Sequence, residues 1–251
     1  MMNKKRKIVI VGATSAMAER CARLWVCEEA IDLTLIGRDL DKTERIAQDL
    51  QVRSPESRIQ VRTVDFTNPD AITDLAKDVA TGDSIDTVLI AHGSLPNQFV
   101  CQEDLNENFQ SLLVNGVSPA LFAEAFAGHM EKSNMGTLAI IGSVAGDRGR
   151  KSNYIYGAAK GLVARYAQGL QHRLANTNVK VVLIKPGPTD TPMTALQKQE
   201  GMKLAKVDDV AAMIVNGIAR GKPVIYAPGK WALIMMVVRH IPSAVFNRIN
   251  I

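Results

Sequence analysis

The sequence predicts an α/β protein with a doubly wound, mostly parallel sheet of seven strands and helices on both faces. Short apolar runs alternate with helix-compatible segments, and chains with this alternation build parallel sheets. Several runs are almost wholly apolar, as strands buried on both faces are. The length of 251 residues suits one domain over 1–251, with an apolar C-terminal extension at about 229–251. The runs lie at 7–13, 33–37, 59–65, 86–93, 136–143, 180–187 and 223–228.

The composition is that of a globular protein with a small excess of positive charge. Thirty Lys and Arg residues against 25 Asp and Glu residues give a net charge of +5, which attracts anions mildly and does not indicate a nucleic-acid-binding protein. No window holds the ~18 consecutive apolar residues of a membrane span. The three cysteines, Cys21, Cys27 and Cys101, lack metal-ligand spacing, and with no secretory signal we expect free thiols, no metal site and a cytoplasmic protein.

The first apolar run leads into the turn GATSAMA at 12–18, which opens a helix through about Cys27. Such a turn aims backbone N–H groups and the positive end of the helix at a pyrophosphate. Dinucleotide sites usually place several glycines here, but this turn keeps only Gly12. Ala16 and Ala18 stand at the positions of the other glycines.

The second run ends in Gly37-Arg38, which bears on the choice of cofactor. A carboxylate at this strand end accepts from the ribose 2′-hydroxyl of NAD, whereas an arginine favours a 2′-phosphate. We therefore expect NADP(H) rather than NAD(H), with Thr14 and Ser15 as further donors to that phosphate. The alternative is that Arg38 begins a solvated loop, and the adjacent Asp39 would offset part of the attraction.

Asp65, at the end of the third run, has two interpretations. Its carboxylate would accept from the adenine amine of a nucleotide, or it would cap the helix that follows.

The stretch SNYIYGAAK at 152–160 places two tyrosines before one lysine. In a helix over 154–176, residues four apart share a face, so Tyr156 rather than Tyr154 lies over Lys160. A free tyrosine has a pKa of ~10, so acid–base chemistry near neutrality needs a stabilised phenolate. An ammonium one helical turn away supplies that stabilisation. The pair therefore predicts a proton-transfer site.

Together these motifs resemble the short-chain dehydrogenase/reductase family over the whole chain. The resemblance rests on GATSAMA, Asn115 in SLLVNG, Ser143 in IIGSVAG, the Tyr156–Lys160 pair and PGPTDTPM from Pro186. Ser143 lies 13 residues before Tyr156, the separation usual in that family. The resemblance implies a Rossmann fold and an NADP(H)-dependent oxidoreductase that reduces a ketone.

The resemblance also implies a role for each catalytic residue. Tyr156 would protonate the carbonyl oxygen during reduction and act as the base in the reverse direction, while Ser143 would hydrogen-bond that oxygen. Lys160 would bind the nicotinamide ribose and lower the Tyr156 pKa, and Asn115 would help to hold a water-linked proton path to Lys160. Thr191 would touch the nicotinamide carboxamide. The implied cofactor contacts are Gly12, Thr14, Ser15, Met17, Arg38, Asp65, Phe66, Ala91, Gly93, Tyr156, Lys160, Pro186, Gly187, Thr189 and Thr191.

The chain departs from the family after the fourth strand, where Asn-Asn-Ala-Gly is replaced by Ile90-Ala91-His92-Gly93. We expect His92 to pack or to hydrogen-bond near the adenosine; the alternative is a role as an additional acid.

Two features bear on the substrate. Arg148, Arg150 and Lys151 lie on a loop that should border the substrate mouth, and arginine forks suit phosphate oxygens. The alternative is a solvated basic loop. We expect Arg148, Arg150 and Tyr154 to contact substrate, although Tyr154 could equally pack against the protein.

The second feature is the tail. It is apolar from Trp231 to Val238, continues through Arg239 and His240 to a break at Pro242, and ends in a short piece carrying Val245, Phe246, Ile249 and Ile251. Eight apolar residues cannot span a bilayer, but such a segment can lie in a membrane surface. It could instead cover the substrate pocket or pack in a dimer interface.

The basic loop and the tail together resemble the subgroup that contains decaprenylphosphoryl-2-keto-ribose reductase. That resemblance implies a lipid-linked keto-sugar as the substrate and contact with the inner face of the membrane. A soluble carbonyl or 3-oxoacyl reductase is the alternative, since it needs the same four catalytic residues. A non-catalytic NADP-sensing protein is less favoured because those residues are retained. Members of the family commonly form oligomers, so the resemblance also implies a homodimer or homotetramer.

Overall fold

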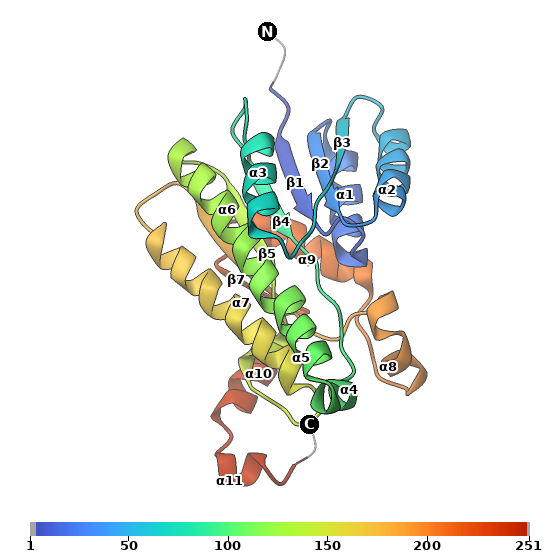
Figure 1. Cartoon of the computed structure of the whole chain (residues 1–251), viewed down its shortest axis with the longest axis vertical. Helices are drawn as coiled ribbons and strands as arrows, with labels where there is room; N and C mark the ends of the chain where they lie inside the picture. Colours follow the sequence, from blue (N-terminus) through green and yellow to red (C-terminus); the bar gives the residue numbers. More distant parts are fainter. Residues whose placement is uncertain (1–3, 250–251) are drawn as a thin grey trace.

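Residues 4–249, the part of the chain that this computed structural model describes, contain one sheet of seven parallel strands (Figure 1). The strand order is β3-β2-β1-β4-β5-β6-β7, so the order reverses between β1 and β4, where doubly wound sheets bind ligands. The predicted Rossmann fold is confirmed. The strands are β1 (Lys7–Val11), β2 (Asp32–Gly37), β3 (Arg58–Thr63), β4 (Thr87–Ile90), β5 (Thr137–Ile141), β6 (Lys180–Pro186) and β7 (Val224–Ala227).

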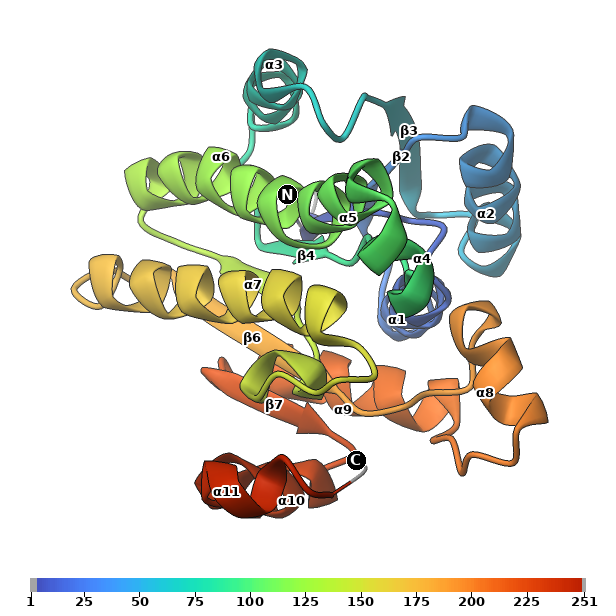
Figure 2. The same cartoon turned by 60° about the horizontal axis from the view of Figure 1, so that its bottom comes forward.

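Helices cover both faces of the sheet (Figure 2). On one face lie α1 (Ala16–Glu28), α2 (Leu40–Arg53) and α9 (Val207–Ala219); on the other lie α3 (Pro69–Val79), α6 (Ser118–Ser133) and α7 (Tyr154–Arg173). Shorter elements carry the chain around the carboxyl ends of the strands. These are α4 (Gln98–Glu103), α5 (Leu105–Leu112), the π-helical turn η1 (Leu113–Val117), the 3₁₀ turns η2 (Val144–Asp147) and η3 (Pro192–Thr194), and α8 (Ala195–Gln199).

The alternation of side chains along the central strand creates two cores. In β1, Ile8 and Ile10 face one side and Val9 faces the other. The first core packs against Trp25 of α1, and the second packs against Phe122 of α6; both aromatic side chains are fully buried. Because both faces are covered, the strands are the apolar runs that the sequence contains.

Helix starts follow from local capping. The Asn68 side chain accepts from the N–H groups of Asp70 and Ala71, and Pro69 occupies the first position of α3, where its missing N–H costs nothing. Asp65 therefore does not cap this helix.

The C-terminal extension folds as α10 (Lys230–His240) and α11 (Ser243–Phe246), beside β7 and η2. Its last two positions, 250 and 251, lie outside the described residues. Arg148 anchors it: the guanidinium donates to the carbonyls of Val238 and Ile241, each at 2.6 Å, and lies 3.7 Å from the centre of the Phe246 ring. The extension is thus attached to the loop after β5.

One helical run, Leu105–Ser133, is long and apolar enough to cross a membrane by length and composition alone. It comprises α5, η1 and α6, and more than half of its apolar window is buried inside the protein. The core helices of soluble proteins meet the same criterion, so this run carries little weight as a membrane span.

Candidate active site

Two adjoining hollows lie beyond the carboxyl ends of the strands. The smaller, of about 120 Å³, surrounds Tyr156, and the larger, of about 580 Å³, surrounds Arg38. They form one continuous trough because they share six lining residues, which are Ser15, Met17, His92, Gly93, Thr191 and Met193. An elongated ligand therefore fits along the edge of the sheet.

The turn after β1 forms the floor of the larger hollow. Gly12 has a φ of +82°, in the left-handed region, and a Cβ there would lie 2.6 Å from the backbone nitrogen of His92. Only glycine suits this position. Ser15 is the N-cap of α1, yet its hydroxyl makes no capping hydrogen bond and remains available to a ligand. The turn therefore presents backbone and hydroxyl groups at the positive end of a helix.

Arg38 is exposed at the end of β2, in the wall of the larger hollow. Its guanidinium lies 5.9 Å from the centre of the Phe66 ring. Asp39 beside it is already engaged, because its carboxylate accepts from the Lys42 N–H at 3.0 Å and pairs with the Lys42 ammonium at 3.1 Å. These bonds lower the pKa of the Asp39 carboxyl. Within residues 4–249, Arg38 itself has no ion-pair partner, so its charge is free for an anion.

Asp65 is not among the residues that line either hollow. Its carboxylate accepts from the N–H and the hydroxyl of Thr67, at 2.8 and 2.7 Å, which lowers the pKa of the Asp65 carboxyl. The helix-cap interpretation of Asp65 is therefore wrong, because Asn68 caps α3 and Asp65 forms a local turn with Thr67, while its contact with adenine stays a prediction.

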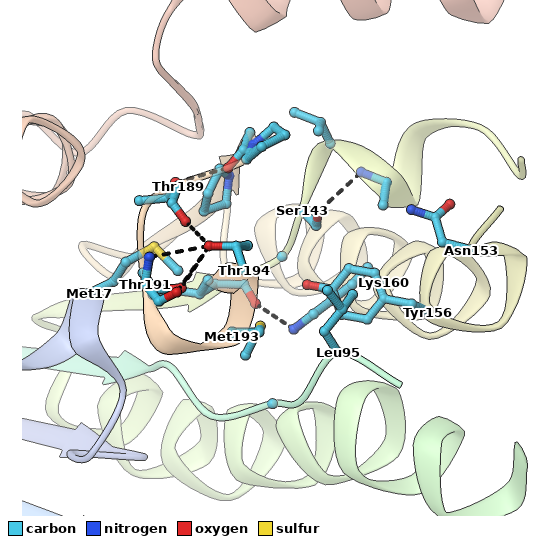
Figure 3. A pocket seen from close by; sticks show the side chains of 18 of the residues that line it. Met17, Leu95, Ser143, Asn153, Tyr156, Lys160, Thr189, Thr191, Met193 and Thr194 are labelled. Carbon is cyan, nitrogen blue, oxygen red and sulfur yellow. Dashed lines mark hydrogen bonds between the residues drawn. The ribbon is translucent and has the colours of Figure 1, made fainter. Parts of the chain in front are cut away.

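Ser143, Tyr156 and Lys160 line the smaller hollow together (Figure 3). Ser143 follows β5 and begins η2, where its Oγ accepts from the Ala145 N–H at 3.1 Å. Tyr156 and Lys160 lie in the first turns of α7, with the Lys160 Nζ 5.8 Å from the centre of the Tyr156 ring. That Nζ is buried and donates to the Ile141 carbonyl at 3.1 Å.

Burial disfavours the charged form of both titrating groups. It raises the pKa of the Tyr156 phenol to about 12, and interaction with the Ser143 hydroxyl acts in the opposite direction. It lowers the pKa of the Lys160 ammonium to about 8. Burial, rather than the predicted influence of Lys160, thus has the largest effect on the Tyr156 pKa. At neutral pH the phenol holds its proton and the lysine is positively charged.

Asn115 lies beneath the smaller hollow, fully buried in the π-helical turn η1. Its Oδ1 accepts from the Ser94 N–H at 2.8 Å and its Nδ2 donates to the Ser111 carbonyl at 3.0 Å. A Cβ at Gly93 would lie 2.8 Å from this Oδ1 and 3.5 Å from the Lys160 Nζ. Gly93 therefore marks the point where Asn115 and Lys160 approach each other.

His92 is buried in an aromatic cluster. Its ring meets those of Phe66 and Phe122 edge-on at 4.7 and 5.4 Å, and its Nε2 is 2.9 Å from the Ser118 hydroxyl. Burial lowers the pKa of His92 to about 3, assisted by the charges of Lys160 and Arg38. The imidazole is neutral at physiological pH, which suits the predicted packing role better than that of an acid.

The three predicted substrate residues are separated. Arg150 lines the smaller hollow, Arg148 is committed to the ends of α10 and α11, and Tyr154 is exposed at the first position of α7. Backbone carbonyls and the Phe246 ring already engage the Arg148 guanidinium, so of the two arginines only Arg150 lines the hollow. The remaining predicted cofactor residues that line one or both hollows are Thr14, Met17, Phe66, Ala91, Pro186, Gly187, Thr189 and Thr191.

The sequence did not predict a buried ionic cluster behind the Ser143 turn. The Lys185 ammonium of β6 pairs with the Asp147 carboxylate of η2, both side chains being almost fully buried. The Tyr226 hydroxyl of β7 donates to the same carboxylate at 2.8 Å. This cluster fixes η2 to the two last strands. The one sign of this cluster in the sequence is that Lys185 interrupts an otherwise apolar strand.

Comparison with known proteins gives one family. The model of the short chain dehydrogenase family matches residues 6–201. An uncharacterized oxidoreductase of Streptomyces coelicolor is 30% identical over 250 residues, which cover 97% of this chain and 96% of that protein.

Solved structures resemble the fold. A short-chain dehydrogenase from Sphingobium yanoikuyae in complex with NADPH superposes with a TM-score of 0.80 at 22% identity, covering 98% of this chain and 96% of that one. A short chain dehydrogenase from Burkholderia cenocepacia in complex with NADP gives 0.82 at 18% identity, covering 99% and 98%. At these identities the likeness concerns the fold alone.

The buried cluster behind Ser143 gives a prediction about stability. Asp147→Leu should lower the free energy of unfolding by about 3–5 kcal/mol, because it leaves the buried Lys185 ammonium without its partner. Urea unfolding followed by circular dichroism measures the change. The double variant Asp147→Leu/Lys185→Met, which removes both charges, should recover much of the loss. A double variant no more stable than Asp147→Leu would contradict this interpretation.

Proposed function

This chain belongs to the short-chain dehydrogenase/reductase family of oxidoreductases, and we propose that it reduces a ketone to an alcohol with NADPH. The observation that carries the proposal is that Ser143, Tyr156 and Lys160 line one small hollow continuous with a larger one around Arg38. Proton-transfer groups and a trough that holds an elongated ligand thus adjoin each other.

The trough fits a nicotinamide dinucleotide. Gly12 leaves room for close approach to the backbone, and the amino end of α1 suits a pyrophosphate. When bound, the nicotinamide supplies the hydride. Toward the other end of the trough, Lys160 would hold the nicotinamide ribose, and Pro186, Gly187 and Thr191 would flank the nicotinamide.

The protein's own part of the reaction is to deliver a proton. Tyr156 keeps its phenolic proton at neutral pH, so it can donate that proton to a carbonyl oxygen during reduction. Ser143 would donate a hydrogen bond to the same oxygen, because its hydrogen is not used in the bond from Ala145. The nearby Lys160 ammonium favours the resulting phenolate, and Asn115 holds the backbone beneath it.

NADP(H) is the cofactor form that we propose. Arg38 has an uncommitted positive charge in the larger hollow, and Lys42 lines the same wall. The nearby Asp39 carboxylate is engaged with Lys42 and is thereby less able to repel a phosphate. A 2′-phosphate suits this surface better than a bare 2′-hydroxyl.

A lipid-linked keto-sugar is the substrate class that we propose, bound at the inner face of a membrane. Support comes from α10 and α11, which expose Leu233, Met236, Val237 and Val245 next to the loop that carries Arg148 and Arg150. An apolar surface of this kind suits contact with lipid. A soluble carbonyl or 3-oxoacyl reductase would use the same four catalytic residues, so the exposed extension is the feature that favours the lipid.

We further propose a homodimer or homotetramer formed through α5 and α7. Large apolar side chains are exposed on this side of the protein, which indicates a contact surface. They are Phe109, Leu112, Leu162 and Tyr166.

Replacement of the proton donor tests the reaction. Tyr156→Phe should lower kcat for ketone reduction by about 10²–10⁴-fold, because it removes the general acid while keeping the ring. NADPH binding, measured by fluorescence titration, should change little. Tyr154→Phe, at an exposed tyrosine that does not line the hollow, is the matched control and should retain kcat close to that of the wild type. Full activity in Tyr156→Phe would contradict the mechanism.

Replacement of Arg38 tests the cofactor preference. Arg38→Ala should weaken NADPH binding by roughly 10- to 100-fold, the value of a charge-assisted contact, and leave NADH binding nearly unchanged. Arg45→Ala, which removes an exposed arginine of α2 outside the trough, should affect neither nucleotide. Equal weakening of both nucleotides by Arg38→Ala would exclude a 2′-phosphate contact.

The pKa values predict a pH profile for reduction. With the Lys160 pKa at about 8, the ammonium is present below pH 8 and is lost as the pH rises through that value. Tyr156, with a pKa of about 12, stays protonated throughout. The kcat/KM for reduction should therefore be level below pH 8 and fall above it by about tenfold per pH unit. A level profile up to pH 10 would contradict the role of Lys160.

A further inference from the structure

Arg150 is a half-buried cation in the wall of the smaller hollow, and it has no ion-pair partner within residues 4–249. Its Nε is shielded from solvent and has no hydrogen-bond partner in the same part of the chain. Burial lowers the pKa of Arg150, which reflects the cost of removing this charge from water. Arg148, two residues earlier, contrasts with it, since backbone carbonyls engage its guanidinium.

Asn153 supplies a second unsatisfied group in the same wall. Its Oδ1 is buried without a donor, and its N–H donates to the Arg150 carbonyl at 3.1 Å, which closes the turn that carries both side chains. Asn153 is the N-cap of α7, three residues before Tyr156, and both residues line the smaller hollow. Figure 3 shows Asn153 beside Ser143 and Tyr156, on the side of the hollow opposite Thr189 and Thr191.

The charged residues that line the smaller hollow are all positive. In the described part of the chain they are Arg150 and Lys160, and no Asp or Glu lines the hollow. Lys160 already donates to the Ile141 carbonyl and lies next to the proton donor. Arg150 is therefore the cation left to bind a group away from the reacting carbonyl. The Arg150 Nε and the Asn153 Oδ1 are shielded atoms of a kind that normally has a hydrogen-bond partner, and a ligand in the hollow can supply one to each.

We propose that the substrate carries an anionic oxygen group, which Arg150 binds, and a neighbouring hydroxyl, which donates to the Asn153 side-chain oxygen. This proposal rests on the ketone reduction proposed above and restricts its substrate. A carboxylate and a phosphate both match the guanidinium fork, so either satisfies the site. The anion would fix the distance and orientation of the carbonyl relative to the Tyr156 phenol.

Matched pairs of ketones test the proposal. Acetoacetate is compared with methyl acetoacetate, and dihydroxyacetone phosphate with dihydroxyacetone, using NADPH and the full-length protein. The wild type should prefer at least one anion over its neutral partner. Arg150→Gln should lower kcat/KM for that anion by roughly 10- to 100-fold and leave the neutral ketone nearly unchanged, because it removes one charge-assisted contact. The pair that responds identifies the anion as carboxylate or phosphate.

Two variants control for the charge and the fold. Lys151→Gln removes the same charge from an exposed position of the same loop and should not alter the preference. Arg150→Lys keeps the charge and should retain part of the preference for the anionic ketone. Unchanged fluorescence titration with NADPH in all three variants establishes that the nucleotide site is intact. Equal losses for charged and neutral ketones in Arg150→Gln, or the same loss in Lys151→Gln, would overturn the proposal.

A binding measurement separates this proposal from the proposed reaction. With NADPH present, glycerol 3-phosphate or 3-hydroxybutyrate should raise the melting temperature of the wild type more than the neutral glycerol or methyl 3-hydroxybutyrate does. Arg150→Gln should remove that difference. Anion binding without reduction of any ketone would sustain the anion site and contradict the proposed reaction. Reduction of neutral and anionic ketones at equal rates, with no difference in melting temperature, would contradict the anion site alone.

Discussion

Close packing of α7 against the turns on either side of it is the constraint on which the site depends. A Cβ at Gly146 of η2 would lie 2.6 Å from the backbone carbon of Lys160, and one at Gly116 of η1 would lie 3.1 Å from the Ala159 carbonyl oxygen. Without side chains at these contacts, α7 approaches both turns closely. Ser143 and the Tyr156–Lys160 pair thus meet in one small hollow, with Asn115 of a third segment beneath it.

That packing also sets the electrostatics of the site. The elements that bring the groups together exclude water from them, so the phenol keeps its proton while the lysine stays charged at neutral pH. A reductase needs this combination, a proton to donate and a cation to stabilise the phenolate left behind. The Asp147–Lys185–Tyr226 cluster supports the arrangement from behind, because it fixes the Ser143 turn to β6 and β7.

The sequence predicted the strands and the helical pairing of Tyr156 with Lys160 because both depend on local periodicity. It placed the end of the first strand run at residue 13, whereas β1 ends at Val11, since Gly12, with a φ of +82°, already begins the turn. It could not separate Arg148 from Arg150. The two arginines share one loop and one chemistry, and only tertiary contacts direct the first to the C-terminal extension and leave the second in the hollow.

We propose that NADPH bound in this trough transfers hydride to a ketone while Tyr156 supplies the proton. Single-turnover reaction with NADPH that carries deuterium at the transferred position tests it most directly, with the alcohol product analysed by mass spectrometry. We expect deuterium on the former carbonyl carbon with the wild type and none within the same time with Tyr156→Phe. Bound NADPH that transfers no deuterium to any carbonyl compound, or equal transfer by both proteins, would contradict it.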